Sequence, residues 1–294
     1  MKIAFTFLLA MFVLVACKKG NDVPLATIQD EAVEPDPQLA VPVPAGHYAL
    51  GPFSGVGNRF FRYVGGPNYV GVIGTFGDNH IRNAAGGAPL LNVTGLTVIG
   101  NFGYCLSRPA AGLNWQIWRF PSGNPNAAIL WSTIGGTAAF VLSDIEKDPT
   151  ANRAFLLNRT TQQVCNIPFV AGATGIVAAG AYGGLVPNVS GLAMVGATVF
   201  ILGQNGATGY LMRCNAGLVP AWALPVAAYT PPGVPFAFTE SGCFYDATIS
   251  NSFIVGSQAA GPNWAQAVPL GGPGAPVAPA WLPSNIRMID FSPL

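Results

Sequence analysis

The strongest constraint on the fold is a short motif that recurs at nearly regular intervals. The motif is Ser or Thr, then Gly, Asp or Asn, then an apolar residue, and its copies begin at Thr94, Ser143, Ser190, Ser241 and Ser284. Successive copies are 49, 47, 51 and 43 residues apart. A period of about 40–50 residues indicates a repeated supersecondary unit that buries its apolar faces only by stacking on its neighbours.

A second motif, aromatic–any–aliphatic–small or polar, follows the first by ten or twelve residues. Its copies begin at Tyr48, Tyr104, Phe155, Phe200 and Phe253. Tyr48 has no first motif before it, and Ser284 has no aromatic motif after it. We therefore expect residues 284–293 to pair with residues 47–51, so that the two incomplete units make one and no sheet edge is left open.

We expect four strands in each unit, because short runs of Val, Ile, Phe and Tyr recur between Gly, Asn and Pro. Long helices are disfavoured by the 37 glycines and 26 prolines. We letter these strands A to D. Strand A carries the first motif and strand B the second. The C strands are expected at 59–64, 115–120, 162–167, 210–215 and 264–270, and the D strands at 69–76, 127–132, 175–182, 220–226 and 275–283.

Over residues 46–294 this pattern resembles a five-bladed β-propeller, an all-β fold closed here by strands from both ends of the domain. The alternative is a sandwich of repeated hairpins.

The N-terminal residues are typical of export rather than of a fold. Lys2 precedes an apolar run that is short for a membrane-spanning helix. Leu14-Val15-Ala16-Cys17 resembles the lipobox of bacterial lipoproteins, which implies a signal peptide over 1–16 and acyl chains such as palmitate on Cys17. The alternative is an ordinary signal peptide with an incidental cysteine.

Lys18 and Lys19 follow the cysteine, where an aspartate would resemble the inner-membrane retention signal. The outer membrane is therefore favoured. A charged tract at this place also resembles lipoproteins of Bacteroidota, some of which are displayed on the cell surface, so the periplasmic and surface sides both stay open.

Residues 17–45 comprise the lipidated Cys17 and a tether that we expect to be disordered. Residues 18–45 hold five prolines and five acids. Such a composition buries too little apolar surface to order itself, and a coil of this length reaches about 30 Å.

The domain that follows is poor in charge. Residues 46–294 hold ten Lys and Arg and seven Asp and Glu, a balance too small and scattered for nucleic-acid binding. We expect Cys105, Cys165, Cys214 and Cys243 to be buried free thiols, because the repeat places them on different units. With only His47 and His80 and no CxxC pair, the sequence indicates no metal site and no cofactor.

In a propeller the B–C and D–A connections share one face. The five Ser and Thr residues of the first motif lie there, and five similar copies favour hydrogen bonds to the backbone of neighbouring units over binding of sugars. Asymmetric loops are better candidates for a binding site. The candidate residues are Asp78, His80 and Arg82 in the long D–A connection 77–92, Arg108 in a B–C connection, and Glu240 at the end of residues 230–240.

Catalysis is not expected. Glycoside hydrolysis needs two carboxylates across a sugar, and only Asp144 and Glu240 lie near this face, while Asp148, Asp246 and Asp290 fall at the opposite one. Tryptophans at repeated strand positions are expected mostly in the core, although Trp131, Trp222 and Trp281 lie on the outermost strands.

Three functions follow from these observations. The first is a non-enzymatic interaction module, lipid-anchored at the outer membrane and bound to an envelope or cell-surface protein. The second is glycan binding through the loop face, and the third is a glycoside hydrolase.

Overall fold

The computed structural model describes residues 47–53, 56–64, 72–74, 80–182, 188–205, 208–215, 217–226, 241–246, 252–257, 264–269, 280–281 and 290–292. Side chains are described for 80–182, for most of 189–219 and for 243 and 245. The chain divides into two units, Met1–Pro42 and Val43–Leu294. The signal peptide, Cys17 and nearly all of the tether fall in the first unit, which lies outside the described residues.

The described strands of the second unit form five antiparallel four-stranded sheets, which we number in chain order. Sheet 1 contains β20 (Asp290–Ser292), β1 (His47–Phe53), β2 (Val56–Val64) and β3 (Val72–Gly74). Sheet 2 contains β4 (Thr94–Ile99), β5 (Phe102–Ser107), β6 (Trp115–Pro121) and β7 (Ile129–Ile134). Sheet 3 contains β8 (Leu142–Lys147), β9 (Arg153–Asn158), β10 (Gln163–Pro168) and β11 (Ala178–Ala181). Sheet 4 contains β12 (Asn188–Val195), β13 (Thr198–Asn205), β14 (Thr208–Cys214) and β15 (Pro220–Val226). Sheet 5 contains β16 (Ser241–Asp246), β17 (Ser252–Ser257), β18 (Trp264–Pro269) and β19 (Ala280–Trp281).

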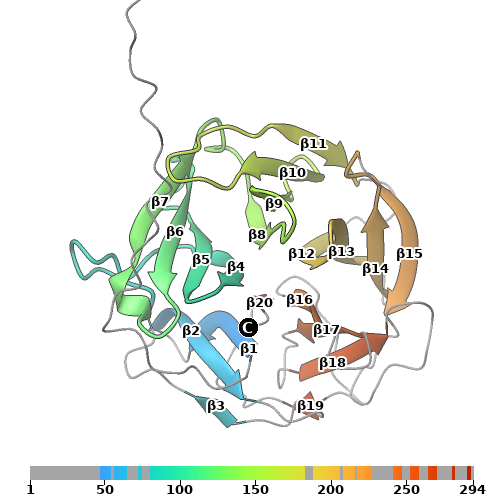
Figure 1. The fold of residues 1–294 in the computed structure, drawn as a ribbon, viewed down its shortest axis with the longest axis horizontal. Helices are drawn as coiled ribbons and strands as arrows, with labels where there is room; N and C mark the ends of the chain where they lie inside the picture. Colours follow the sequence, from blue (N-terminus) through green and yellow to red (C-terminus); the bar gives the residue numbers. More distant parts are fainter. Residues whose placement is uncertain are drawn as a thin grey trace, which may run out of the picture. The chain divides into compact units, whose positions relative to one another are not determined.

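The first strand of each sheet contacts the first strand of the next. These contacts join β4 to β8, β8 to β12 and β12 to β16, and β20 contacts both β16 and β4. Figure 1 shows these strands around a common centre, with the later strands of each sheet outside them. The all-β, propeller-like arrangement expected from the repeat is confirmed, and β20 pairs with β1 through Ser292–Tyr48, Phe291–Ala49 and Asp290–Leu50.

The first motif marks an irregularity in three of the inner strands. The register shifts between Thr94 and Leu96 in β4, between Leu142 and Asp144 in β8, and between Val189 and Gly191 in β12. Such bulges bend a strand and increase its twist. At Gly95 the backbone adopts φ +61°, and an added Cβ would lie 2.6 Å from Ile145 N and 2.7 Å from Asp144 Cα. Only glycine allows this approach of β4 to β8.

The hydrophobic core lies mainly between neighbouring sheets. Between sheets 2 and 3, Tyr104, Leu106 and Ile117 pack with Ile145, Leu156 and Phe169. Between sheets 3 and 4, Phe155, Leu157 and Val164 pack with Leu192, Ile201 and Met212. Tyr104 and Phe155, two of the aromatics of the second motif, therefore fill the spaces between sheets.

The connections from the third to the fourth strand reach back to the preceding unit. In the 122–128 connection, Ala128 N donates to Arg82 O at 2.9 Å. In the 169–177 connection, Gly172 N donates to Trp131 O at 2.9 Å, and Thr174 O accepts from Gly135 N at 2.7 Å. In the next connection, Gly217 and Leu218 approach Gly180 of β11 too closely for any Cβ there. These contacts cover the outer strands of sheets 2 and 3, which would otherwise present open edges.

Helical structure in the described residues is confined to a short 3-10 helix, Pro125–Ala127. None of the helical structure in those residues is long and apolar enough to span a bilayer.

The contact at Gly95 gives a direct test of this packing. We expect Gly95→Ala to lower the free energy of unfolding by about 2–5 kcal/mol, because it combines the cost of positive φ with overlap against β8. Gly100→Ala is the matched control, since Gly100 has φ +55° but no atom within 4 Å of an added Cβ. The control should lose only about 1–2 kcal/mol in urea unfolding. Equal losses in the two variants would contradict the packing described.

Candidate interaction surfaces

The ends of each sheet define two faces for the described part of the domain. At the A–B end lie the connections from first to second and from third to fourth strands. At the B–C end lie the connections from second to third strands and from one sheet to the next. The described copies of the first motif, in sheets 2 to 5, lie at the B–C end, where the inner strands begin.

The hydroxyl groups of the first motif have different surroundings in different sheets. Thr94 Oγ1 donates to Leu142 O of the next sheet at 2.9 Å. Ser143 Oγ is buried without a hydrogen-bond partner. In its place the carboxylate of Asp144, the second residue of the motif, accepts from Leu192 N of sheet 4 and from Ile145 N at 2.7 Å. The side chains of Ser190, Ser241 and Ser284 lie outside the described part.

In the two copies whose polar side chains are described, a side chain of the motif hydrogen-bonds to a backbone group of the next sheet. The side-chain group is a hydroxyl in sheet 2 and a carboxylate in sheet 3. The hydroxyl-to-backbone bond predicted for the repeat is therefore present at Thr94 and absent at Ser143, where the Asp144 carboxylate makes the bond to the next sheet instead.

Arg82, a candidate binding residue in the long D–A connection, does not lie beside Arg108. Asp78 and Glu240 lie outside the described residues. His80 is buried, and Arg82 belongs to a hairpin, residues 81–90, in which Leu90 N donates to Ile81 O and Arg82 Nη1 donates to Gly87 O. Figure 1 shows this segment, in teal, projecting outward beside β7.

The backbone of Arg82 hydrogen-bonds to Pro125 O, in the connection at the A–B end of sheet 2. Arg108 follows β5 at the B–C end. The seven residues of β6 separate the two ends, which is about 20 Å at 3.3 Å per residue. The hairpin packs Ile81 and Leu90 against Trp118 and Phe120, so it covers the outer part of sheet 2 instead of remaining at the loop face.

Arg108 is held at the B–C end by three neighbours. Its guanidinium lies 5.1 Å from the centre of the Trp115 ring, and Nη1 donates to Phe140 O at 3.1 Å. Its backbone oxygen accepts from Asn92 Nδ2 at 2.9 Å. Nε is buried without a partner. Arg108 thus ties the B–C connection of sheet 2 to the connection that leads into sheet 3.

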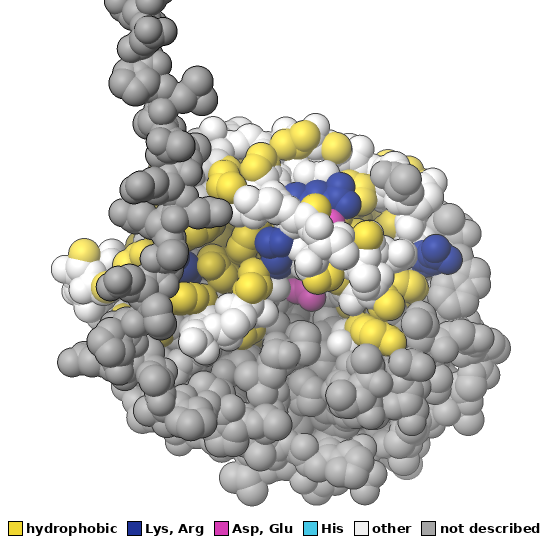
Figure 2. Space-filling view, viewed as in Figure 1, with side chains coloured by type: hydrophobic (Ala, Val, Ile, Leu, Met, Phe, Trp, Pro, Cys, Tyr) yellow, Lys and Arg dark blue, Asp and Glu magenta, His cyan; other side chains and the backbone are white. Residues whose placement is uncertain are grey.

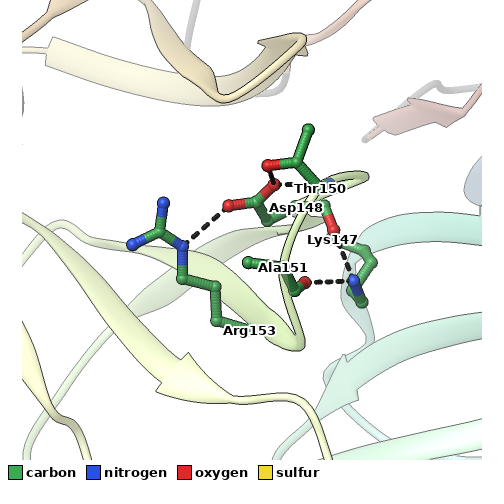
Figure 3. Close-up of polar contacts among 5 residues, drawn as sticks. All are labelled: Lys147, Asp148, Thr150, Ala151 and Arg153. Atoms are coloured by element: carbon green, nitrogen blue, oxygen red, sulfur yellow. Dashed lines mark hydrogen bonds and ion pairs between the residues drawn. The ribbon is translucent and has the colours of Figure 1, made fainter.

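The acids at the inner edge of sheet 3 are buried and engaged. Glu146 is 9% exposed, and burial raises its pKa well above the ordinary value, with the Asp144 carboxylate adding to the rise and a hydrogen bond with Thr97 opposing it. Figure 3 shows Asp148 accepting from Thr150 and from Arg153 Nε at 2.7 Å. Burial alone would raise the pKa of Asp148, but these hydrogen bonds and the Arg153 charge lower it.

Cysteines and tryptophans behave largely as the sequence predicts. Cys105, Cys165, Cys214 and Cys243 are free and buried, as predicted, and burial raises the pKa of Cys165 to about 11 and that of Cys214 to about 12. Trp115 and Trp118 belong to the core, and Trp131 is half-buried. The side chains of Trp222, Trp264 and Trp281 are outside the described set. Among the described residues, no His, Cys, Asp and Glu side chains gather as a metal site would require.

One group of residues at the A–B end is missed by the sequence interpretation. The strand register places an arginine opposite the repeat aromatic in three sheets, in the pairs Arg62–Tyr48, Arg119–Tyr104 and Arg213–Phe200. The guanidinium of Arg119 lies 4.8 Å from the centre of the Phe102 ring and 4.7 Å from that of Trp131. A signal existed in the sequence, because each arginine follows the aromatic by 13 to 15 residues.

Comparison with known proteins supports the fold and assigns no family. No protein-family model matches the sequence, and no curated protein matches it. A chain of a crystal structure described as a nidogen/laminin complex aligns with a TM-score of 0.50 and 9% identity, covering 84% of this chain and 97% of that one.

Two bacterial proteins align less closely. A protein of unknown function from Bacteroides thetaiotaomicron has a TM-score of 0.47 and 13% identity, covering 85% of this chain and 65% of that one. A protein from Lactobacillus plantarum has a TM-score of 0.45 and 9% identity, covering 83% and 82%. At these identities the first likeness supports the propeller-like class alone.

The buried Glu146 predicts an unusual pH dependence. The pKa of Glu146 is raised in the folded state, so as the pH rises the unfolded state loses the carboxyl proton before the folded state does. The free energy of unfolding therefore falls as the pH rises above about 4.3, the ordinary pKa of glutamate. The slope reaches at most about 1.4 kcal/mol per pH unit. Glu146→Gln keeps the shape of the protonated acid without titrating, so it should be more stable than wild type at pH 7–8 and about equal at pH 4.

Urea unfolding of both proteins across this pH range checks the prediction. Asp148 has a lowered pKa, so its contribution to the free energy of unfolding is lost in acid. This contribution is the same in wild type and in Glu146→Gln, so it cancels when the two free energies are subtracted. A wild-type protein that is more stable than Glu146→Gln at pH 8 would contradict the assignment.

Proposed function

We propose that this protein is a lipid-anchored, five-bladed β-propeller that acts as a non-enzymatic protein-interaction module in an outer-membrane complex. The fold part rests on the five four-stranded sheets, on the successive contacts of their first strands and on the pairing of β20 with β1. The likeness to the chain of the nidogen/laminin complex supports the propeller-like class.

The anchor part rests on the sequence. The lipobox at Leu14–Cys17 supplies the attachment site, and the Pro-rich, acidic tether holds the domain away from the bilayer. Lys18 and Lys19 favour the outer membrane.

The observation that carries the interaction role is the exposed apolar surface of a domain with few charges. Nine large aliphatic side chains among the described residues are more than a third exposed. They include Leu91, Leu113 and Val141 at the B–C end, and Ile129 and Val170 at the A–B end. Apolar side chains that lie close together on a charge-poor surface favour contact with another protein.

The acids of sheet 3 support a non-enzymatic role. Asp144 is 2% exposed and accepts from two backbone amides, and Asp148 is fully buried against Thr150 and Arg153. A hydrolytic carboxylate must face its substrate. The glycan-binding alternative loses part of its basis, because the described geometry separates Arg82 from Arg108.

Affinity purification of the full-length protein from the cells that produce it tests the proposal. Membranes are dissolved in mild detergent, with Cys17→Ala as the matched control. Wild type should fractionate with the outer membrane and retain a protein partner in stoichiometric amount, whereas Cys17→Ala should appear in the soluble fraction.

Loss of the partner at every detergent strength would count against the interaction role. Glycosidase activity that disappears in Glu240→Gln or Asp144→Asn would replace it with the enzymatic alternative. Protease treatment of intact cells then determines which side of the membrane the domain faces.

A further inference from the structure

A cluster of aromatic and cationic side chains lies at the A–B end, between sheets 2 and 3. We call it the Arg119 patch and define it as Phe102, Arg119, Trp131, Lys147 and Phe169. Arg119 lies between the Phe102 and Trp131 rings, and Lys147 Nζ lies 5.7 Å from the centre of the Phe169 ring. Trp131 and Phe169 are joined through Tyr104, whose ring contacts both edge-on at 5.6 and 4.8 Å between centres.

The aromatic contacts hold the two cations in place. Arg119 is fixed between two rings, and Lys147 Nζ donates to the backbone oxygens of Asp148 and Ala151. Neither cation forms an ion pair with a carboxylate within the part of the chain that is described. A guanidinium already stacked on rings loses little side-chain freedom on binding, which makes it an effective anchor for a partner carboxylate.

Charge is sorted by depth around the patch. The basic groups reach the surface, since Arg119 and Lys147 are half-buried and the Arg153 side chain is 40% exposed. The acids lie inside, with Asp148 at 0% and Glu146 at 9% exposure. The accessible charge at this place is therefore positive, although the chain as a whole carries only +1.

Apolar side chains border the cations. Ile129 stands directly opposite Arg119 on the neighbouring strand and is 43% exposed. Val170 is 42% exposed and follows Phe169, in the connection whose Gly172 binds the Trp131 carbonyl. Figure 2 shows the same association at a larger scale, with dark-blue Lys and Arg side chains lying among yellow ones over sheets 2 and 3.

We propose that the Arg119 patch is the docking surface for the protein partner, and that it binds a segment of that partner in which carboxylates alternate with apolar side chains. The carboxylates would pair with Arg119 and Lys147, and the apolar side chains would cover Ile129 and Val170. This inference rests on the proposed function, because it names the place and chemistry of the same interaction.

The surroundings favour a protein segment over an acidic glycan or a lipid headgroup. A polyanion gains from many exposed cations and gains nothing from bare aliphatic groups. Here a few cations stand beside half-exposed Ile129 and Val170, which only an apolar side chain can cover favourably. Arginine and tryptophan at the centre of such a surface are the residue types that most often dominate binding between proteins.

Site-specific photocrosslinking in full-length, lipidated protein tests the inference. The photoreactive residue p-benzoylphenylalanine replaces Ile129 at the patch or, as the matched control, Leu113 at the B–C end. Both positions are exposed aliphatic residues, at 43% and 53%. Illumination of the producing cells should give a protein adduct from position 129 and none from position 113, with the crosslinked partner peptide rich in Asp and Glu.

Charge variants then test the chemistry of the contact. Arg119→Gln and Lys147→Gln together should lower the adduct yield at 129 about tenfold, as expected for loss of a binding anchor. Arg213→Gln, which removes an exposed arginine at the same repeat position of sheet 4, should leave the yield unchanged. If the double variant does not fold, salt provides the same test on wild-type membranes. At about 1 M salt, charges are screened beyond about 3 Å, so the adduct yield at position 129 should fall in the same way.

The outcomes separate the two levels of the proposal. A protein adduct from 113 and none from 129 overturns the assignment of the patch but leaves the interaction role in place. No protein adduct from either position also overturns the assignment of the patch, whereas the interaction role itself is contradicted only if the affinity purification described above retains no partner. An adduct from 129 that is glycan or lipid, or one insensitive to both the charge variants and salt, overturns the acidic-segment partner.

Discussion

The close approach of neighbouring inner strands is the contact on which the rest of the domain depends. At Gly95 the backbone of β4 comes so near to β8 that no side chain fits between them. The same short motif then bonds one sheet to the next, through the Thr94 hydroxyl to Leu142 O and through the Asp144 carboxylate to Leu192 N. Because these bonds run to backbone groups, they fix the spacing of the sheets whatever core residues fill the gap. Outside them, the aromatics Tyr104 and Phe155 of the second strands fill the space, and the connections after β10 and β14 cover the outer edges of sheets 2 and 3.

The proposed binding surface lies at the ends of the sheets. Among the described inner carboxylates, Asp144 bonds one sheet to the next, and Glu146 is buried with a raised pKa, so both are turned away from solvent. The basic groups of the Arg119 patch lie on β6 and at the end of β8, and the aliphatic groups beside them lie on β7 and in the connection after β10, where they are partly exposed. A rigid domain with buried acids and exposed cations at one place is suited to binding an acidic partner, and a lipid anchor on a tether would present such a domain near a membrane.

Much of the architecture could be predicted from the sequence, because the repeat depends on local patterns. The motif spacing located the strands, and the two incomplete units pointed to the pairing of β20 with β1.

The register of the last strand was harder to predict. In sheets 2 and 3 the residue three positions after the start of the first motif, Thr97 or Glu146, pairs with the repeat aromatic, Tyr104 or Phe155. The same rule applied to the motif at Ser284 would pair Arg287 with Tyr48, but Ser292 pairs with Tyr48. The register therefore differs from this rule by an odd number of residues, which reverses the face of the sheet that each side chain of β20 takes. The candidate site was also hard to predict, because the arginines are seen to lie opposite the aromatics only once the strands are paired. The packing of the 81–90 hairpin on sheet 2 could not be predicted either, because it depends on tertiary contacts that local sequence patterns do not contain.

The pairing of the first and last strands is the central claim, because the closed order of sheets and the assignment of loops to faces follow from it. Introducing a disulfide tests it most directly. Ala49 and Phe291 are partners across β1 and β20, so cysteines at these two positions should oxidise to an intrachain disulfide in the folded protein. The protein's own Cys105, Cys165, Cys214 and Cys243 are buried, so they should not compete for this disulfide. Cysteines at Ala49 and Ser292, one residue out of register, should point to opposite faces of the sheet and remain reduced. Rapid formation of the 49–291 disulfide without the 49–292 one, with a higher urea midpoint in the crosslinked protein, is the predicted result. Failure of the 49–291 pair to oxidise in the folded state would contradict the account.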